Sequence, residues 1–308
     1  METQQDTTQQ VLPTTPVPQQ ARNGLLYVCI AVMFFGTSSV FTRWSAPFNA
    51  LEIAFWRLAI AAILVAIFGL ITRQSLLLAR RDIPRFLLYG LVTALHFFFY
   101  NASLNYTTVA HSLSITYTSP IFVALFSVLF LRESLPIRKY VGIGIAVLGI
   151  AILVGFEPQY RECSLTTTGN CMVLGDGLAL LSAICFGIYS IAGRGERERH
   201  PLFRYTMNVY GMAALWLLPL ELYFAFDHPY PLLAVGSILA LGIFPLGLGH
   251  TLYNASVRKI HATYANLIAT QEVTIGVILG IFLLGEIPSL AAIIGGVVTL
   301  AGIISVLI

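Results

Sequence analysis

Long apolar segments alternate with short polar joins along almost the whole chain. An α-helix needs about 20 apolar residues to cross the hydrocarbon core of a bilayer. Ten segments come near that length and predict ten transmembrane helices, at about residues 24–44, 50–71, 84–106, 109–131, 138–156, 174–193, 203–226, 231–254, 260–284 and 288–308. Residues 1–22 are mostly Gln, Thr and Pro, so we expect a disordered tail there.

One stretch of the sequence occurs twice, 153 residues apart. Residues 100–133 read YNASLNYTTVAHSLSITYTSPIFVALFSVLFLRE, and residues 253–286 read YNASVRKIHATYANLIATQEVTIGVILGIFLLGE, without a gap between them. The register continues beyond Glu133 and Glu286. Such self-similarity indicates an internal duplication. It predicts two repeats of five helices each, at residues 23–156 and 174–308, joined by a linker at 157–173.

Composition agrees with a membrane location. The chain is 57% hydrophobic and only 10% charged, with a mean hydropathy of +0.82. A soluble domain is about one quarter charged, and a single core could not bury this much apolar surface. The sequence therefore predicts an all-α polytopic membrane protein.

The basic residues predict the orientation of the chain. If the N-terminus is cytoplasmic, 14 of the 17 Lys and Arg residues fall on the cytoplasmic side, as the positive-inside rule requires. Both termini are then cytoplasmic, in the inner (plasma) membrane. Because each repeat has an odd number of helices, the second repeat is expected to insert upside down. Inverted repeats are typical of secondary transporters, whose substrate site lies near the midplane between the repeats.

Several short motifs carry a resemblance to a known family. They are FWRL at 55–58, Ser119–Pro120 followed by VALFSVLFLRESL, a Gly-rich fifth helix, and FLLGE at the end of the second copy. With the doubled five-helix layout, residues 24–308 resemble the EamA type of the drug/metabolite transporter superfamily. The resemblance implies ten helices, alternating access around a central cavity, and carriage of small metabolites such as amino acids, usually outward. Family members often have Glu-Pro where this chain has Glu272–Val273, so the expected hinge lacks its proline there.

Polar side chains at membrane depth are the candidates for chemistry, because they are costly to bury without a partner or a watery cavity. Glu272 lies near the middle of the ninth predicted helix. A carboxyl group out of water holds its proton more readily, which suits it to proton coupling or to binding an ammonium group. The alternative is a protonated or hydrogen-bonded glutamate that locks two helices together.

Other polar and aromatic residues recur at helical spacing and could line a cavity. The alternative for each is a polar contact or aromatic packing between helices. The candidate substrate-binding residues are His96, Tyr100, Tyr117, Thr118, Tyr189, His250, Tyr253 and Gln271.

Two further groups are expected to be structural. Arg57 lies about two turns into the second predicted helix, where it would extend to the interface or pair with Glu52. Four glycines repeated by the duplication are expected to let helices pack closely: Gly142, Gly149, Gly295 and Gly302.

The four cysteines fall into two classes. Cys163 and Cys171 lie in the predicted external linker, where an oxidising space favours a disulfide; zinc is the alternative, although no histidine accompanies them. Cys29 and Cys185 lie in apolar helices and are expected to be buried.

Other functional classes lack their signatures. The sequence has no G-x-x-x-x-G-K-[ST] motif for ATP-driven transport, no catalytic or metal-ligand spacing, and no nucleic-acid patch, so no cofactor is expected. The hypothesis is a monomeric secondary carrier that exports a small metabolite, most simply an aromatic or large neutral amino acid, with protons as a candidate coupling ion. The alternatives are an importer or exchanger of a charged metabolite such as a nucleoside derivative, with Arg57 or Glu272 in the cavity, and a membrane enzyme or sensor for a lipid-soluble ligand.

Overall fold

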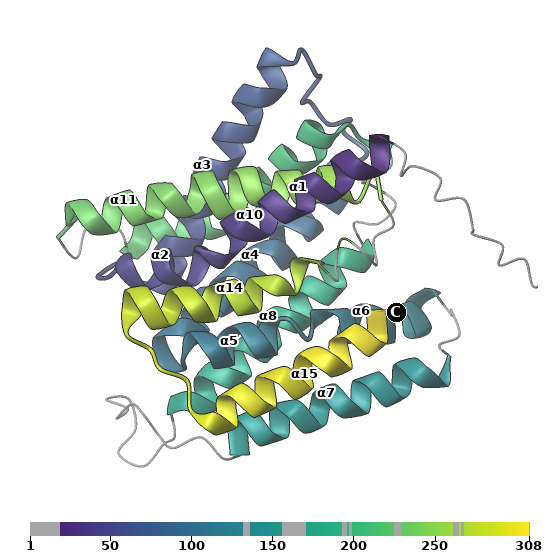
Figure 1. Ribbon diagram of the computed structural model, residues 1–308. Helices are drawn as coiled ribbons and strands as arrows, with labels where there is room; N and C mark the ends of the chain where they lie inside the picture. Colours follow the sequence, from purple (N-terminus) through teal and green to yellow (C-terminus); the bar gives the residue numbers. More distant parts are fainter. Residues whose placement is uncertain are drawn as a thin grey trace, which may run out of the picture.

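The computed structural model describes residues 19–131, 136–155, 171–192, 196, 199–224, 229–260, 265 and 268–307. Within these ranges every regular element is a helix, and the helices form a bundle (Figure 1). The expected all-helical fold is confirmed. Helix begins at Gln19 and at Cys171, within the last residues expected for the tail and the linker. The amide of Gln19 donates to Asn23 one turn on, at 2.9 Å, which supports this extra helical turn.

The helices of the first half follow the predicted segments, with two interruptions. The helix is interrupted at Thr37, and another helix is interrupted just before Pro120, whose ring is incompatible with a continuous helix. The elements are α1 (Gln19–Gly36), α2 (Ser38–Trp44), α3 (Ala50–Ile71), α4 (Ile83–Tyr106), α5 (Val109–Thr116), α6 (Ser119–Leu131) and α7 (Ile137–Gly155).

The second half contains two π-helical segments. One of them includes Pro245, which removes a backbone donor and favours a wider turn. The elements are α8 (Cys171–Ala192), α10 (Leu202–Phe224), α11 (Leu232–Leu241), η1 (Gly242–His250), α12 (Thr251–Ser256), α14 (Gln271–Leu279), η2 (Gly280–Leu284) and α15 (Leu290–Leu307).

Six helical segments within the described ranges are long and apolar enough to cross a membrane. They are Gln19–Trp44, Ala50–Ile71, Ile83–Tyr106, Val109–Phe126, Cys171–Ile191 and Leu232–Ser256. Gln271–Leu284 and Leu290–Val306 are apolar but shorter. Many large apolar side chains on the outside of the bundle are exposed, for example Leu70 and Phe282, as expected where lipid replaces water. The protein is therefore a multi-pass membrane protein, and the number of ten helices stays a prediction.

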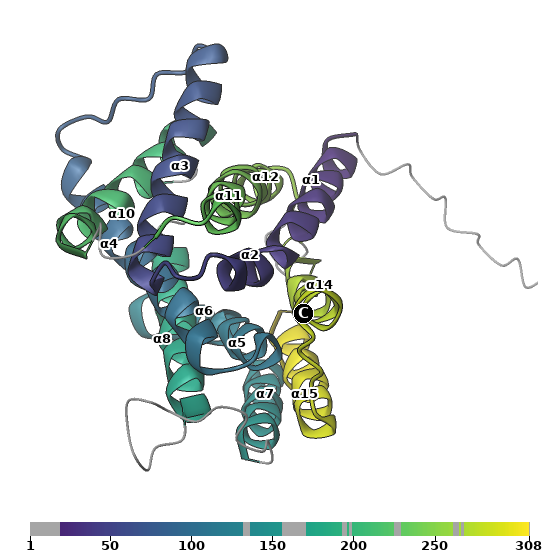
Figure 2. The ribbon, with the colours of Figure 1, turned by 90° about the vertical axis from the view of Figure 1, so that its left-hand side faces the viewer.

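Helices of one half pack mainly on helices of the other. Helix α4 packs on α8, α1 packs on η1 and α12, and α3 packs on α10. Helices α7 and α15 lie side by side at one edge of the bundle in both views (Figures 1 and 2). Helix α1 begins the first copy and packs on η1 and α12 of the second copy. Helix α8 begins the second copy and packs on α4 of the first, so the two contacts are equivalent under the duplication. The packing therefore fits a duplicated architecture.

The glycines repeated by the duplication bring α7 and α15 together. A Cβ atom placed on Gly142, Gly149, Gly295 or Gly302 would come within 3 Å of backbone atoms of the facing helix. Gly142 would meet the Gly302 carbonyl oxygen at 2.9 Å, and Gly295 would meet the Leu153 nitrogen at 2.7 Å. The prediction that these are close-packing positions is confirmed, since only a residue without a side chain fits there.

We expect Gly149→Ala to separate α7 from α15 and to lower the free energy of unfolding by about 1–3 kcal/mol. Gly144→Ala is the matched control, because it lies on the same helix and its Cβ would have nothing within 4 Å. Thermal unfolding in detergent measures both variants. Equal melting temperatures would contradict the packing role of Gly149.

Candidate functional site

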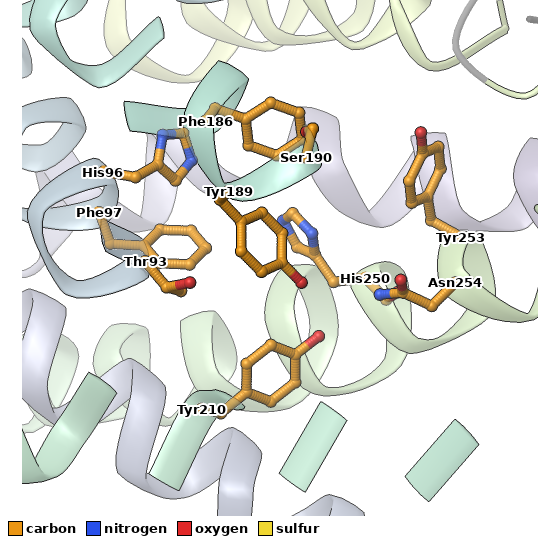
Figure 3. A pocket seen from close by; sticks show the side chains of 10 residues that line it. All are labelled: Thr93, His96, Phe97, Phe186, Tyr189, Ser190, Tyr210, His250, Tyr253 and Asn254. Carbon is orange, nitrogen blue, oxygen red and sulfur yellow. The ribbon is translucent and has the colours of Figure 1, made fainter. Parts of the chain in front are cut away.

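A small central cavity lies between the two halves of the chain (Figure 3). Helix α4 supplies three of its residues, and α8, α10, η1 and α12 supply the rest. Its volume is about 30 Å³, room for about two water molecules, so the cavity is contracted. The lining residues are Thr93, His96, Phe97, Phe186, Tyr189, Ser190, Tyr210, His250, Tyr253 and Asn254.

Aromatic rings form most of the wall and contact one another in series. The ring centroids of His96 and Phe186 lie 5.1 Å apart, and those of Phe97 and His250 lie 5.7 Å apart. The Tyr205 hydroxyl donates to the Tyr189 hydroxyl at 2.8 Å. Figure 3 shows these rings around the cavity, with hydroxyl, amide and imidazole groups among them. Such a wall fits an apolar body and has a few polar groups to orient it.

Phe97 and His250 occupy equivalent positions in the two copies, 153 residues apart. They are also in contact with each other. A residue that touches its own counterpart lies close to the axis that relates the two copies. The cavity therefore lies where the two halves meet.

His96 is fixed by Ser182 of α8. The Ser182 hydroxyl donates to the His96 carbonyl at 3.0 Å, and the ring nitrogen Nδ1 lies 3.0 Å from the Ser182 carbonyl oxygen. A carbonyl oxygen only accepts, so this contact assigns the hydrogen to Nδ1. The ring is thereby held against the cavity wall.

Four of the eight predicted cavity residues line this cavity: His96, Tyr189, His250 and Tyr253. The other four lie elsewhere. Tyr100, Tyr117 and Thr118 lie outside the cavity lining, and Thr118 donates to the Ile115 carbonyl at 2.6 Å. Gln271 is exposed.

Six cavity residues were not predicted: Thr93, Phe97, Phe186, Ser190, Tyr210 and Asn254. The duplication contained a signal for one of them, since Phe97 is the counterpart of His250, which was predicted.

Glu272 lies in the first turn of α14, and its carboxylate accepts a hydrogen bond from the Tyr117 hydroxyl. Tyr117 lies at the interruption between α5 and α6. The carboxylate thus joins a broken helix of the first half to a helix of the second, and it lies outside the cavity lining.

Arg57 does not pair with Glu52, and it does not extend to the interface. Its side chain is 1% exposed. Its Nη1 donates to Asn101 Oδ1 and its Nη2 to Ser38 Oγ, both at 3.2 Å. Glu52 instead accepts from the Asn49 backbone at 2.7 Å, in the capping box that begins α3. Residues five apart do not share a helix face, which is why the expected pair fails.

A larger cavity of about 430 Å³ lies at the end of the bundle that the charge pattern predicts to be outside. Arg43 and Glu286, which both line it, form an ion pair at 2.7 Å. Arg43 also donates to the carbonyls of Leu104 and Thr107, and Glu286 accepts from the Val109 backbone at 2.8 Å. These contacts join the two halves at this end. Glu133, the counterpart of Glu286, lies outside the described residues.

Cys171 is disulfide-bonded, and Cys163 lies outside the described residues. Cys29 and Cys185 carry free thiols. The expectation that both are buried was wrong, because Cys29 is exposed and Cys185 is partly exposed. Lipid can surround such apolar side chains on the outside of the bundle. Among the described residues no cluster of His, Cys, Asp and Glu could hold a metal ion.

Comparison with known proteins gives matches along nearly the whole chain. The profile of the EamA-like transporter family matches residues 22–155 and 173–308. The pseudopaline exporter of Pseudomonas aeruginosa is 27% identical over 92% of this chain and 95% of the relative. An uncharacterised transporter of Archaeoglobus fulgidus is 25% identical over 90% of this chain and 96% of the relative.

Two other matches are more distant. A probable terminal-alkyne amino-acid exporter of Streptantibioticus cattleyicolor is 24% identical over 60% of this chain and 59% of the relative. A solved crystal structure superimposes with a TM-score of 0.68 and 18% identity, over 92% of this chain and 96% of the other. That likeness extends to the fold alone.

We expect Arg43→Gln to weaken the junction at the end cavity, because Glu286 then keeps its charge without its partner. The side chains are 12% and 22% exposed, so the loss of unfolding free energy should be about 1–3 kcal/mol. Arg81→Gln, at an exposed turn, is the control. If both variants melt at the temperature of the wild type, the ion pair does not join the halves.

Proposed function

The chain belongs to the EamA-like transporter family, and we propose that it is a secondary carrier that exports a small amphipathic metabolite of the amino-acid class. Its substrate is a small molecule and its surroundings are lipid. The exported molecule would occupy the central cavity, which opens to one side of the membrane and then to the other.

The observation that carries the proposal is the position of the cavity at the contact of Phe97 with His250. Alternating access requires a substrate site that both halves share, because rocking one half against the other then exposes that site to each side in turn. The three α4 residues come from the first half, and the α8, α10, η1 and α12 residues come from the second. A cavity of about 30 Å³ is too small for an amino acid, so the cavity would have to widen when the substrate binds.

The chemistry of the wall supports the substrate class. Rings of Phe97, Phe186 and Tyr189 suit an apolar side chain, and Ser190 and Asn254 supply polar groups. The names of two relatives, an exporter of pseudopaline and a probable exporter of a terminal-alkyne amino acid, support outward transport.

The proposed topology is ten helices in two inverted repeats of five, with both termini in the cytoplasm of the cell and the protein in the inner membrane. The distribution of Lys and Arg supports it. The start of α1 and the described end of α15 lie toward the same end of the bundle (Figure 1), as an even number of crossings requires. The cavity lies within one chain, which supports a monomeric carrier.

Glu272 is the proposed proton site. Its bond from Tyr117 links the two halves, so a change in its protonation would change the contact across which the halves move. The alternative is that the bond between Glu272 and Tyr117 is purely structural, in which case the response of transport to a pH gradient should not depend on Glu272.

We expect the wild type in proteoliposomes to accumulate labelled phenylalanine against an unlabelled internal pool, faster when a pH gradient is imposed. Glu272→Gln should keep the exchange and lose the response to the gradient, because an amide cannot bind and release a proton near neutral pH. Glu221→Gln is the matched control, since Glu221 is a buried carboxylate on α10 that accepts from Trp56 Nε1 at 2.8 Å.

A gradient response that survives in Glu272→Gln would assign Glu272 a structural role. Absence of counterflow in the wild type would remove phenylalanine from the substrate class.

A further inference from the structure

Arg57 is a buried cation whose hydrogen-bond partners, Asn101 and Ser38, are neutral. Glu272 acts on it electrostatically without forming an ion pair. The Arg57 side chain is 1% exposed, and within the part of the chain that the structure describes it forms no ion pair with a carboxylate. A charge at membrane depth is costly unless it is paired, and such residues are characteristic of substrate pathways. The position of Arg57 among helices α2, α3 and α4 therefore needs an explanation beyond packing.

The groups around Arg57 leave hydrogen-bond donors unused. The Asn101 carbonyl oxygen accepts from Arg57 Nη1 at 3.2 Å and from the Thr42 hydroxyl at 3.5 Å, which fixes the orientation of the amide. Arg57 Nε and Asn101 Nδ2 are both buried without a hydrogen-bond partner among the described residues. Two neighbouring side chains thus each offer a donor, and no acceptor reaches them. Buried donors are normally satisfied, so the site is suited to a ligand that brings acceptors.

Only one ring separates this site from the central cavity. The Arg57 guanidinium carbon lies 4.4 Å from the centroid of Phe97, and Phe97 lines the cavity (Figure 3). Arg57 is thus covered by a ring of the cavity wall.

We propose that Arg57 and Asn101 bind the carboxylate of the transported substrate, and that Phe97 covers this anion site while the cavity is contracted. The proposal rests on the proposed function and narrows the substrate class to amphipathic carboxylates. A guanidinium donates to both oxygens of one carboxylate through its planar fork, and Asn101 Nδ2 supplies a further donor. Rotation of the Phe97 ring opens the site to the cavity, where the aromatic wall receives the apolar body of the substrate.

The test compares two probes that differ only in the carboxylate, 3-phenylpropanoate and 3-phenylpropanamide. Binding to the purified full chain in detergent is measured by thermal unfolding over a range of probe concentrations. We expect the wild type to bind the carboxylate about tenfold more tightly than the amide, or better, because hydrogen bonds between charged groups are the stronger ones. In Arg57→Gln the two probes should bind equally.

Asn101→Asp separates binding from structure, because it keeps the size of the side chain. It gives Arg57 an internal carboxylate, so the ligand-free protein should melt no lower than the wild type while its preference for the carboxylate probe disappears. Arg85→Gln on α4 is the control. Arg85 lies away from the cavity and pairs with Glu196 at 2.7 Å, so this variant should keep the full preference for the carboxylate probe.

A wild type stabilised equally by both probes, or by neither, would overturn the proposal, as would an undiminished preference in Asn101→Asp. Counterflow of labelled phenylalanine by the same preparation tells the two failures apart. Transport without carboxylate preference refutes the role of Arg57 and leaves the carrier function in place, whereas carboxylate preference without counterflow keeps the role of Arg57 and removes phenylalanine from the substrate class.

Discussion

Polar groups at membrane depth must find their partners inside the bundle, because lipid offers none. This constraint organises the structure. The carboxylate of Glu272 is satisfied by Tyr117, the ring of His96 by Ser182, and the carboxylate of Asp176 by Thr107 and His111 at 2.8 and 3.1 Å. In every case the two partners come from different halves of the chain. A few polar contacts therefore join the halves, which otherwise pack through apolar and small residues. These polar contacts can be replaced by others when the halves move.

The sequence predicted the elements better than their contacts. Helix α3 was expected at 50–71 and runs from Ala50 to Ile71, because length and hydropathy decide which segments enter a membrane. The interruptions at Thr37 and at Gly242–His250 were not predicted, since backbone geometry there depends on neighbouring helices. The Arg57–Glu52 pair failed for a related reason: hydropathy does not reveal which face of a helix meets which neighbour. His96 was predicted because it lies on the polar face of its helix, whereas Phe186 and Ser190 were missed because hydropathy does not show which face of α8 meets the cavity.

The duplication explains both the symmetry of the site and its departures from symmetry. Phe97 and His250 are counterparts that meet at the cavity, and Asn101 and Asn254 are counterparts with different partners, Arg57 in one case and the His250 carbonyl in the other. Phe97 and His250 themselves differ, one being a phenyl ring and the other an imidazole. Divergence of this kind gives a symmetric framework for motion and an asymmetric site for one substrate.

In the proposed transport cycle, one cavity shared by the two halves is reached from each side of the membrane in turn. Ser190 lines that cavity on α8, and serine to cysteine is a change of one atom. In a background where the free thiols are removed by Cys29→Ser and Cys185→Ser, Ser190→Cys can be labelled with a membrane-impermeant maleimide applied to right-side-out or inside-out vesicles. The account predicts labelling from both sides, slowed from both by saturating phenylalanine. Labelling from one side alone, whatever the substrate concentration, would contradict alternating access around this cavity.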